Sequence, residues 1–151
     1  MRYLVGLGNY TAGDDAVGVR VVEHVVANGL ERGFTAVDLS TNALDLVAYL
    51  DSDTEAVLVV DAVRLDLAPG EYRFFSPDEV ETQKQLVGLS THEGDVLAVL
   101  DLARGAGYPV PPFAIMGIEP QDMTSGITLS ECLAERVPAY AAAAIEHLLR
   151  L

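Results

Sequence analysis

The sequence predicts a three-layer α/β/α fold, with a mostly parallel, twisted five-stranded sheet and helices on both of its faces. Two observations lead to this prediction. Short apolar runs alternate with helical patterns through most of the chain, and no repeat, low-complexity segment or long linker interrupts them. Such alternation favours parallel strands joined by crossover helices. At 151 residues, 50% of them hydrophobic, we expect one domain over residues 1–151.

Five apolar runs have the length of buried strands. They lie at residues 3–7, 34–39, 56–60, 72–75 and 113–118. In open α/β sheets, ligands bind in the crevice beyond the carboxyl ends of the strands. The functional residues are therefore sought at the strand ends.

The first helix is predicted over residues 14–26, because Val17, Val21, Val22 and Val25 recur at a spacing of three to four and cover one face. A second helix is predicted over 42–50. The abundance of valines in the first helix indicates that it packs against the core.

Three later helices are predicted from capping signals. A short helix follows Ser76, where Pro77 fits the first turn, and Ser90 with Glu93 opens a helix that extends to about residue 104. Thr128 with Glu131 opens the C-terminal helix, in which Pro138 is expected to cause a kink.

Composition limits the location and the partners of the protein. A net charge of −14 disfavours nucleic acid, because a polyanion is repelled by this field. No stretch approaches the roughly 20 apolar residues of a membrane span. The single cysteine, Cys132, cannot form an internal disulfide and fits a reducing compartment, so a cytoplasmic protein is expected. A monomer is the default expectation.

The turn after the first strand is rich in glycine and carries two adjacent acids. Gly6 and Gly8 suggest a dinucleotide fingerprint, but Thr11 stands where its third glycine belongs. Asp14 and Asp15 put negative charge where a pyrophosphate requires positive potential. One of these acids is expected to cap the helix, which leaves the other for chemistry.

Asp15, Asp61 and His92 form the predicted metal site. Asp61 directly follows a buried run, and His92 lies where a loop enters a helix. Taken singly, a turn-forming aspartate and a surface histidine are the simpler interpretations. Together, two carboxylates and an imidazole can hold a divalent metal and leave positions open for water and substrate, as metal-assisted hydrolysis requires.

Other hydrolytic signatures are absent from the sequence. Neither H-E-x-x-H nor G-x-S-x-G occurs, and Cys132 lies within a predicted helix, where a structural thiol is expected. The sequence therefore offers no clear candidate for nucleophilic catalysis.

Six short motifs together resemble the nickel-iron hydrogenase maturation endopeptidases. They occur in family order over nearly the whole chain: G-L-G-N from Gly6, G-D-D-x-x-G from Gly13, V-V-D-A ending at Ala62, P-G-E from Pro69, S-T-H from Ser90 and G-I-E-P from Gly117. The combination is far more specific than any one motif.

The resemblance implies a C-terminal processing protease that contacts metal through Asp15, Asp61 and His92. Its partner would be the large-subunit precursor of a nickel-iron hydrogenase, whose own nickel serves for recognition, and no organic cofactor is expected. Asp38 and Thr41 match the segment that recognises the substrate. This chain departs from the family there, because Ser40 stands where a glycine is typical.

Two alternatives remain open at the level of sequence. A nickel-dependent assembly chaperone would use the same residues, dock on an assembling hydrogenase and never cut it. A nucleotide-binding domain at Gly6 and Gly8 is the weaker alternative.

Overall fold

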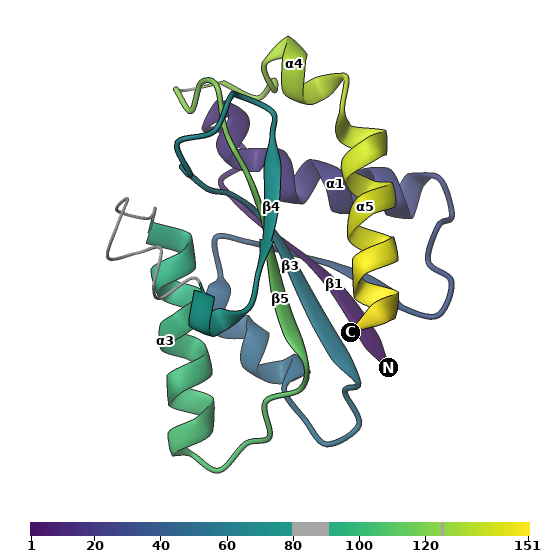
Figure 1. Cartoon of the computed structure of the whole chain (residues 1–151), viewed down its shortest axis with the longest axis vertical. Coiled ribbons are helices and arrows are strands. Elements are labelled where there is room, and N and C mark those ends of the chain that lie inside the picture. The colour runs from purple at the N-terminus through teal and green to yellow at the C-terminus, as the bar shows by residue number, and fades with distance from the viewer. Residues whose placement is uncertain (80–90, 125) are drawn as a thin grey trace.

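The structure is a computed structural model of the chain, which describes residues 1–79, 91–124 and 126–151 and leaves the side chains of 91–94 outside the description. Its centre is a five-stranded sheet with the order β2-β1-β3-β5-β4 (Figure 1). The strands are β1 (Arg2–Leu7), β2 (Thr35–Ser40), β3 (Ala56–Ala62), β4 (Tyr72–Phe75) and β5 (Phe113–Ile118). All five predicted strands are confirmed to within two residues at each end.

Four strands run parallel, and β4 runs antiparallel to β5 at one edge of the sheet. The register pairs Gly6 of β1 with Val60 of β3, and Asp61 of β3 with Gly117 of β5. The carboxyl ends of the four parallel strands therefore meet at the upper end of the molecule in Figure 1. The predicted parallel sheet with an α/β architecture is confirmed.

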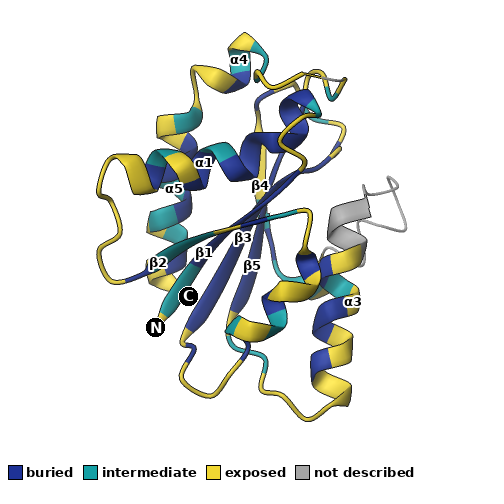
Figure 2. Ribbon diagram, turned by 180° about the vertical axis from the view of Figure 1, so that it is seen from behind, coloured by how far each residue is buried: buried dark blue, intermediate teal, exposed yellow. Residues whose placement is uncertain are grey.

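Helices cover both faces of the sheet, which gives the three predicted layers (Figure 2). On one face lie α1 (Val17–Ala27) and α5 (Val137–Arg150), and on the other lie α3 (Thr91–Gly105) and the 3-10 helix η2 (Ala43–Tyr49). Alternate residues of β3 belong to the two resulting cores: Leu58 and Val60 to the first, Val57 and Val59 to the second. Every residue of β3 is buried, as expected for a central parallel strand.

Two predicted helices differ from expectation in type. The helix predicted over 14–26 begins as a 3-10 turn, η1 (Gly13–Ala16), and continues as α1. The helix predicted over 42–50 is the 3-10 helix η2, whose buried residues Ala43 and Leu46 are three apart. A three-residue repeat lets both side chains face the core, and this spacing suits a 3-10 helix.

The C-terminal helix differs from its predicted start and shape. It divides into α4 (Glu131–Ala134) and α5, and Pro138 occupies the first turn of α5, where its missing N–H costs nothing. The prediction of a kink at Pro138 is therefore wrong. The predicted capping box of Thr128 with Glu131 is also wrong. Ser130 is the N-cap of α4, and its hydroxyl donates to Asp14.

The remaining helix predictions fall partly outside the described residues. The Ser76 hydroxyl accepts a hydrogen bond from the Glu79 backbone N–H at 3.4 Å, and residues 77–79 are helical as predicted. The residues that follow, and Ser90 before α3, lie outside the description. Within the described part of the chain, no helix has the length and apolar character that crossing a bilayer requires.

Candidate metal and substrate site at the carboxyl edge of the sheet

The turn from β1 into α1 is held by two close backbone approaches. A Cβ atom on Gly8 would lie 2.0 Å from the carbonyl oxygen of Asp15, and one on Gly18 would lie 2.1 Å from that of Val60. Gly8 also has a positive φ of 150°, which side chains rarely adopt. These glycines allow η1 and α1 to pack closely against the ends of β1 and β3.

Asp14 is fully buried and binds a segment that is distant in sequence. Its carboxylate accepts backbone hydrogen bonds from Gln121 and Asp122, each at 2.9 Å, and from Ser130 at 2.7 Å. The Ser130 hydroxyl donates a fourth bond at 2.6 Å. The expectation that one acid of the pair caps the helix is wrong, since neither η1 nor α1 has a side-chain cap. Asp14 instead fixes the loop after β5.

Asp15, the next residue, faces the end of β1. Its Oδ2 accepts a hydrogen bond from the Asn9 backbone N–H at 2.9 Å, and the residue is 8% exposed. Asp61 lies within β3 itself and is 1% exposed, with its Oδ1 accepting from the Ala62 N–H at 2.9 Å. Two nearly buried carboxylates thus belong to neighbouring strand ends, a placement that is costly unless a partner or metal compensates it.

The backbone places His92 in the first turn of α3. Alternation along β3 puts Asp61 on the same face as Val57 and Val59, which is the face that α3 covers. The His92 side chain lies outside the described residues, so its distance from the two carboxylates stays a prediction. Among the side chains that the structure describes, no three metal-binding groups gather at one point.

Asp38 and Thr41 lie at the carboxyl end of β2, beside β1, at the same edge of the sheet. Both are exposed. The Asp38 carboxylate accepts hydrogen bonds from the backbone N–H of Ser40 at 2.8 Å and from its hydroxyl at 3.0 Å. Ser40 has a φ of +50°, the left-handed conformation that glycine adopts most readily. Ser40 therefore adopts a backbone conformation that is typical of glycine, and its hydrogen bonds to Asp38 stabilise this conformation.

Glu119 is a buried acid that the sequence analysis did not single out. It follows β5 and is 5% exposed, and its Oε1 accepts backbone hydrogen bonds from Leu65 at 2.7 Å and Leu67 at 2.9 Å. Glu119 thereby fixes the segment between β3 and β4, next to Asp61. Glu119 belongs to the G-I-E-P motif. Its structural role follows only from its hydrogen bonds to residues about fifty positions earlier in the chain.

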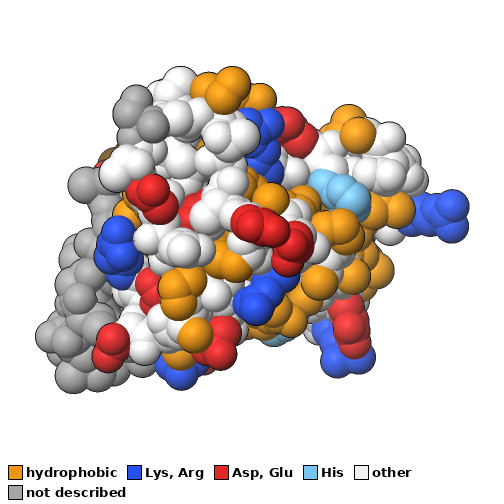
Figure 3. All heavy atoms as spheres, turned by 90° about the horizontal axis from the view of Figure 1, so that it is seen from above, with side chains coloured by type: hydrophobic (Ala, Val, Ile, Leu, Met, Phe, Trp, Pro, Cys, Tyr) orange, Lys and Arg blue, Asp and Glu red, His pale blue; other side chains and the backbone are white. Residues whose placement is uncertain are grey.

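This edge of the molecule is crowded with charge. Figure 3 shows it from above, with acidic side chains near the middle of the face and basic side chains between them and toward the rim. A pocket of about 410 Å³ opens beside Glu119, lined by Arg64, Asp66, Leu67, Pro69, Glu119, Pro120 and Gln121. A polar partner can approach the strand ends along this pocket.

The fold is shared with solved structures of hydrogenase-processing enzymes. The hydrogenase maturating endopeptidase HybD from E. coli superposes with a TM-score of 0.83 and 21% identity, over 99% of this chain and 92% of that one. The nickel-iron hydrogenase maturation protease HybD from Thermococcus kodakarensis gives 0.78 and 20%, over 97% and 98%. The chain therefore has the α/β architecture of the hydrogenase maturation endopeptidases.

Sequence comparison assigns the family. The HycI family of hydrogenase maturation proteases matches residues 19–147. The chain is 26% identical over 147 residues to the hydrogenase expression/formation protein HupD of Rhodobacter capsulatus, covering 96% of this chain and 70% of HupD. It is 32% identical over 83 residues to a putative hydrogenase maturation protease of Methanocaldococcus jannaschii, covering 54% of each. The chain belongs to the hydrogenase maturation protease family, whose members are hydrolases.

Proposed function

We propose that the chain is an endopeptidase that removes the C-terminal extension from the nickel-loaded large-subunit precursor of a nickel-iron hydrogenase. The observation that carries the proposal is the pair of nearly buried carboxylates, Asp15 in the turn after β1 and Asp61 at the end of β3. The helix α3, whose first turn contains His92, covers the sheet face on which Asp61 lies. Family membership supplies the reaction class and the kind of partner.

The donor set suits nickel that arrives with the substrate. Two carboxylate oxygens and one imidazole nitrogen are ligands that a borderline divalent metal accepts, and three protein ligands leave positions for groups of the precursor. In this proposal Asp15, Asp61 and His92 contact the precursor's nickel, and Asp38 with Thr41 contacts the polypeptide around it. Cleavage would then follow only after nickel insertion.

The first experiment measures the intact mass of the precursor before and after incubation with the protein. A candidate large subunit is prepared in nickel-loaded and nickel-free form. Loss of a C-terminal peptide from the nickel-loaded form alone supports a metal-gated endopeptidase. Equal cleavage of both forms keeps the peptidase and removes the nickel requirement. An unchanged mass together with a stable complex would instead identify a chaperone that does not cut.

A further inference from the structure

The strand β4 lies at the edge of the sheet, and some of its backbone N–H and C=O groups point away from β5. The Glu119 N–H donates to the Glu71 carbonyl at 2.8 Å, and the Glu119 carbonyl accepts from the Gly70 N–H at 2.8 Å, so the bonds between the antiparallel segments begin where Glu119 faces Gly70 and Glu71. Because bonded and non-bonded pairs alternate, the N–H and C=O groups of Tyr72 and Phe74 point away from β5. None of the described residues forms a hydrogen bond with these outward groups. The edge therefore has what an added strand requires.

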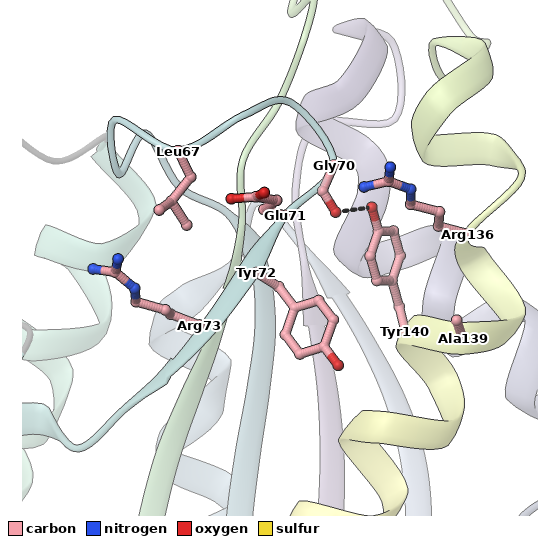
Figure 4. Close-up of a pocket in the computed structure, with 8 residues that line it drawn as sticks. All are labelled: Leu67, Gly70, Glu71, Tyr72, Arg73, Arg136, Ala139 and Tyr140. Atoms are coloured by element: carbon pink, nitrogen blue, oxygen red, sulfur yellow. Dashed lines mark hydrogen bonds between the residues drawn. The ribbon is translucent and has the colours of Figure 1, made fainter.

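A pocket of about 360 Å³ runs along this edge, between β4 and the beginning of α5. Figure 4 shows its lining, with Arg73 and Arg136 on opposite sides of the β4 ribbon. The lining residues are Leu67, Gly70, Glu71, Tyr72, Arg73, Arg136, Ala139 and Tyr140. An extended chain placed beside β4 would thus pass between two guanidinium groups.

The two arginines differ from most other basic residues of this acidic chain. Of nine Lys and Arg residues, four form ion pairs with neighbouring acids: Arg2, Arg20, Arg104 and Arg150. Arg73 and Arg136 form none with any residue that the structure describes. Glu71 is the only acid in the pocket lining, so the lining is net positive in a protein of net charge −14. An anionic group is therefore repelled less here than the overall net charge of −14 would suggest.

The pocket between β4 and α5 is preformed before any partner binds. The Tyr140 hydroxyl donates a hydrogen bond to the Gly70 carbonyl at 2.6 Å (Figure 4). The Tyr140 ring also meets the Tyr72 ring edge to face, with their centroids 5.9 Å apart. Burial raises the pKa of Tyr140 to about 12, so the hydroxyl keeps its proton at neutral pH. A preformed edge lowers the ordering cost of binding.

We propose that the outer edge of β4 binds an extended, acidic segment of the hydrogenase precursor as an additional strand, with Arg73 and Arg136 contacting its carboxylates. The inference deepens the proposed function and rests on it for the identity of the partner. Backbone hydrogen bonds would give affinity, and the arginines would select acidic side chains. A second copy of this chain fits less well, because its own net charge of −14 opposes association.

The test uses a fluorescent peptide of alternating glutamate and valine, and follows its binding by anisotropy. Arg73→Glu is expected to weaken binding about tenfold, or ~1.4 kcal/mol. The matched control is Arg32→Glu, the same charge reversal at an exposed arginine outside the pocket, and it should leave affinity unchanged within about twofold. A peptide N-methylated at alternate positions should also bind weakly, since it cannot pair with the strand edge.

Failure of the glutamate peptide to bind, or equal weakening by both charge reversals, would overturn the docking inference. The inference would also be overturned if sedimentation showed a dimer that Arg73→Glu dissociates, while peptide binding to the variant stayed unchanged. With the nickel-loaded precursor, Arg73→Glu should raise KM about tenfold and leave kcat unchanged. If the peptide binds at the edge but no precursor is cut, the proposed function fails, whereas the inference that the β4 edge binds an acidic segment stands.

Discussion

Asp14 and Asp15 are adjacent in sequence, buried, and serve two different parts of the molecule. Asp14 accepts four hydrogen bonds from the loop at residues 121–130, whereas Asp15 faces the end of β1, close to the strand that carries Asp61. Identical side chains in one 3-10 turn thus have a structural and a proposed functional role. The partners around each carboxylate decide the role, and the residue type does not.

The largest expected effect is the loss of stability in Asp14→Ala. Removing a charged acceptor costs about 1.5–3 kcal/mol per hydrogen bond, and four donors lose their partner, so we expect a loss of about 3 kcal/mol or more. Chemical denaturation measures it. Asp15→Ala is the matched comparison and should cost less than about 2 kcal/mol. Equal losses in both variants would remove the distinction between the two acids.

Activity should show the opposite order. Asp15→Asn and Asp61→Asn keep the size of the side chain and an acceptor oxygen, so the fold should persist. Tail removal from the nickel-loaded precursor should fall at least about 100-fold, because even residues outside the metal's own ligands change affinity or activity by 10–100-fold. Rates are measured by intact mass over time.

The control for these variants is Asp53→Asn, an exposed aspartate in the loop before β3, at the opposite end of the strand from Asp61. It should cleave at the normal rate. Full activity in Asp15→Asn and Asp61→Asn would remove both residues from the proposed site. His92→Ala extends the same test to the third predicted residue.

Ser130→Ala tests the structural role of Asp14 and should have a smaller effect on stability than Asp14→Ala. Ser130→Ala removes the hydroxyl bond to Asp14 and a longer contact of 3.8 Å with the Cys132 thiol, and it leaves the backbone bond, so we expect a loss of about 1–2 kcal/mol in unfolding free energy. The cleavage rate of the folded variant should be unchanged. A large loss of activity with normal stability would mean that the loop near Asp14 takes part in catalysis.

The smallest effect concerns Tyr140, which joins α5 to the segment before β4. Tyr140→Phe loses one hydrogen bond and should cost about 1 kcal/mol at neutral pH. The folded pKa of about 12 lies above the ordinary value of 10.0, so this contribution is complete below pH 10 and is lost between pH 10 and about 12. Denaturation at several pH values should show the gap between wild type and variant narrowing in that window. A constant gap would contradict the assignment.

The sequence predicted the strands well because each is a short apolar run, and the central strands β3 and β5 are buried throughout. It predicted the positions of the first two helices to within one residue, but not where the C-terminal helix begins. The residues at the start of α4 show why: Ser130 gives its hydroxyl to Asp14, 116 positions earlier, and no local pattern signals such a contact. Capping rules describe competition among neighbours, and here a distant acceptor prevails.

For the candidate site, the sequence placed Asp15, Asp61 and Asp38 at one edge of the sheet, since the alternating pattern predicts parallel strands whose carboxyl ends meet there. The order of the strands came from the structure. It did not reveal that Ser40 adopts a left-handed backbone, nor that Glu119 supports the segment after β3. Both depend on three-dimensional contacts. The position of the His92 side chain relative to the two acids remains a prediction.

The bond between Asp14 and Ser130 also determines when the carboxyl edge of the sheet can form during synthesis of the chain. The ribosome adds about 5–20 residues per second, so the acid is made roughly 6–23 s before the serine that completes its shell. Until then, the carboxylate lacks the two donors that Ser130 supplies in the folded protein, and water takes their place. The carboxyl edge of the sheet is therefore completed only after residue 130 has been made.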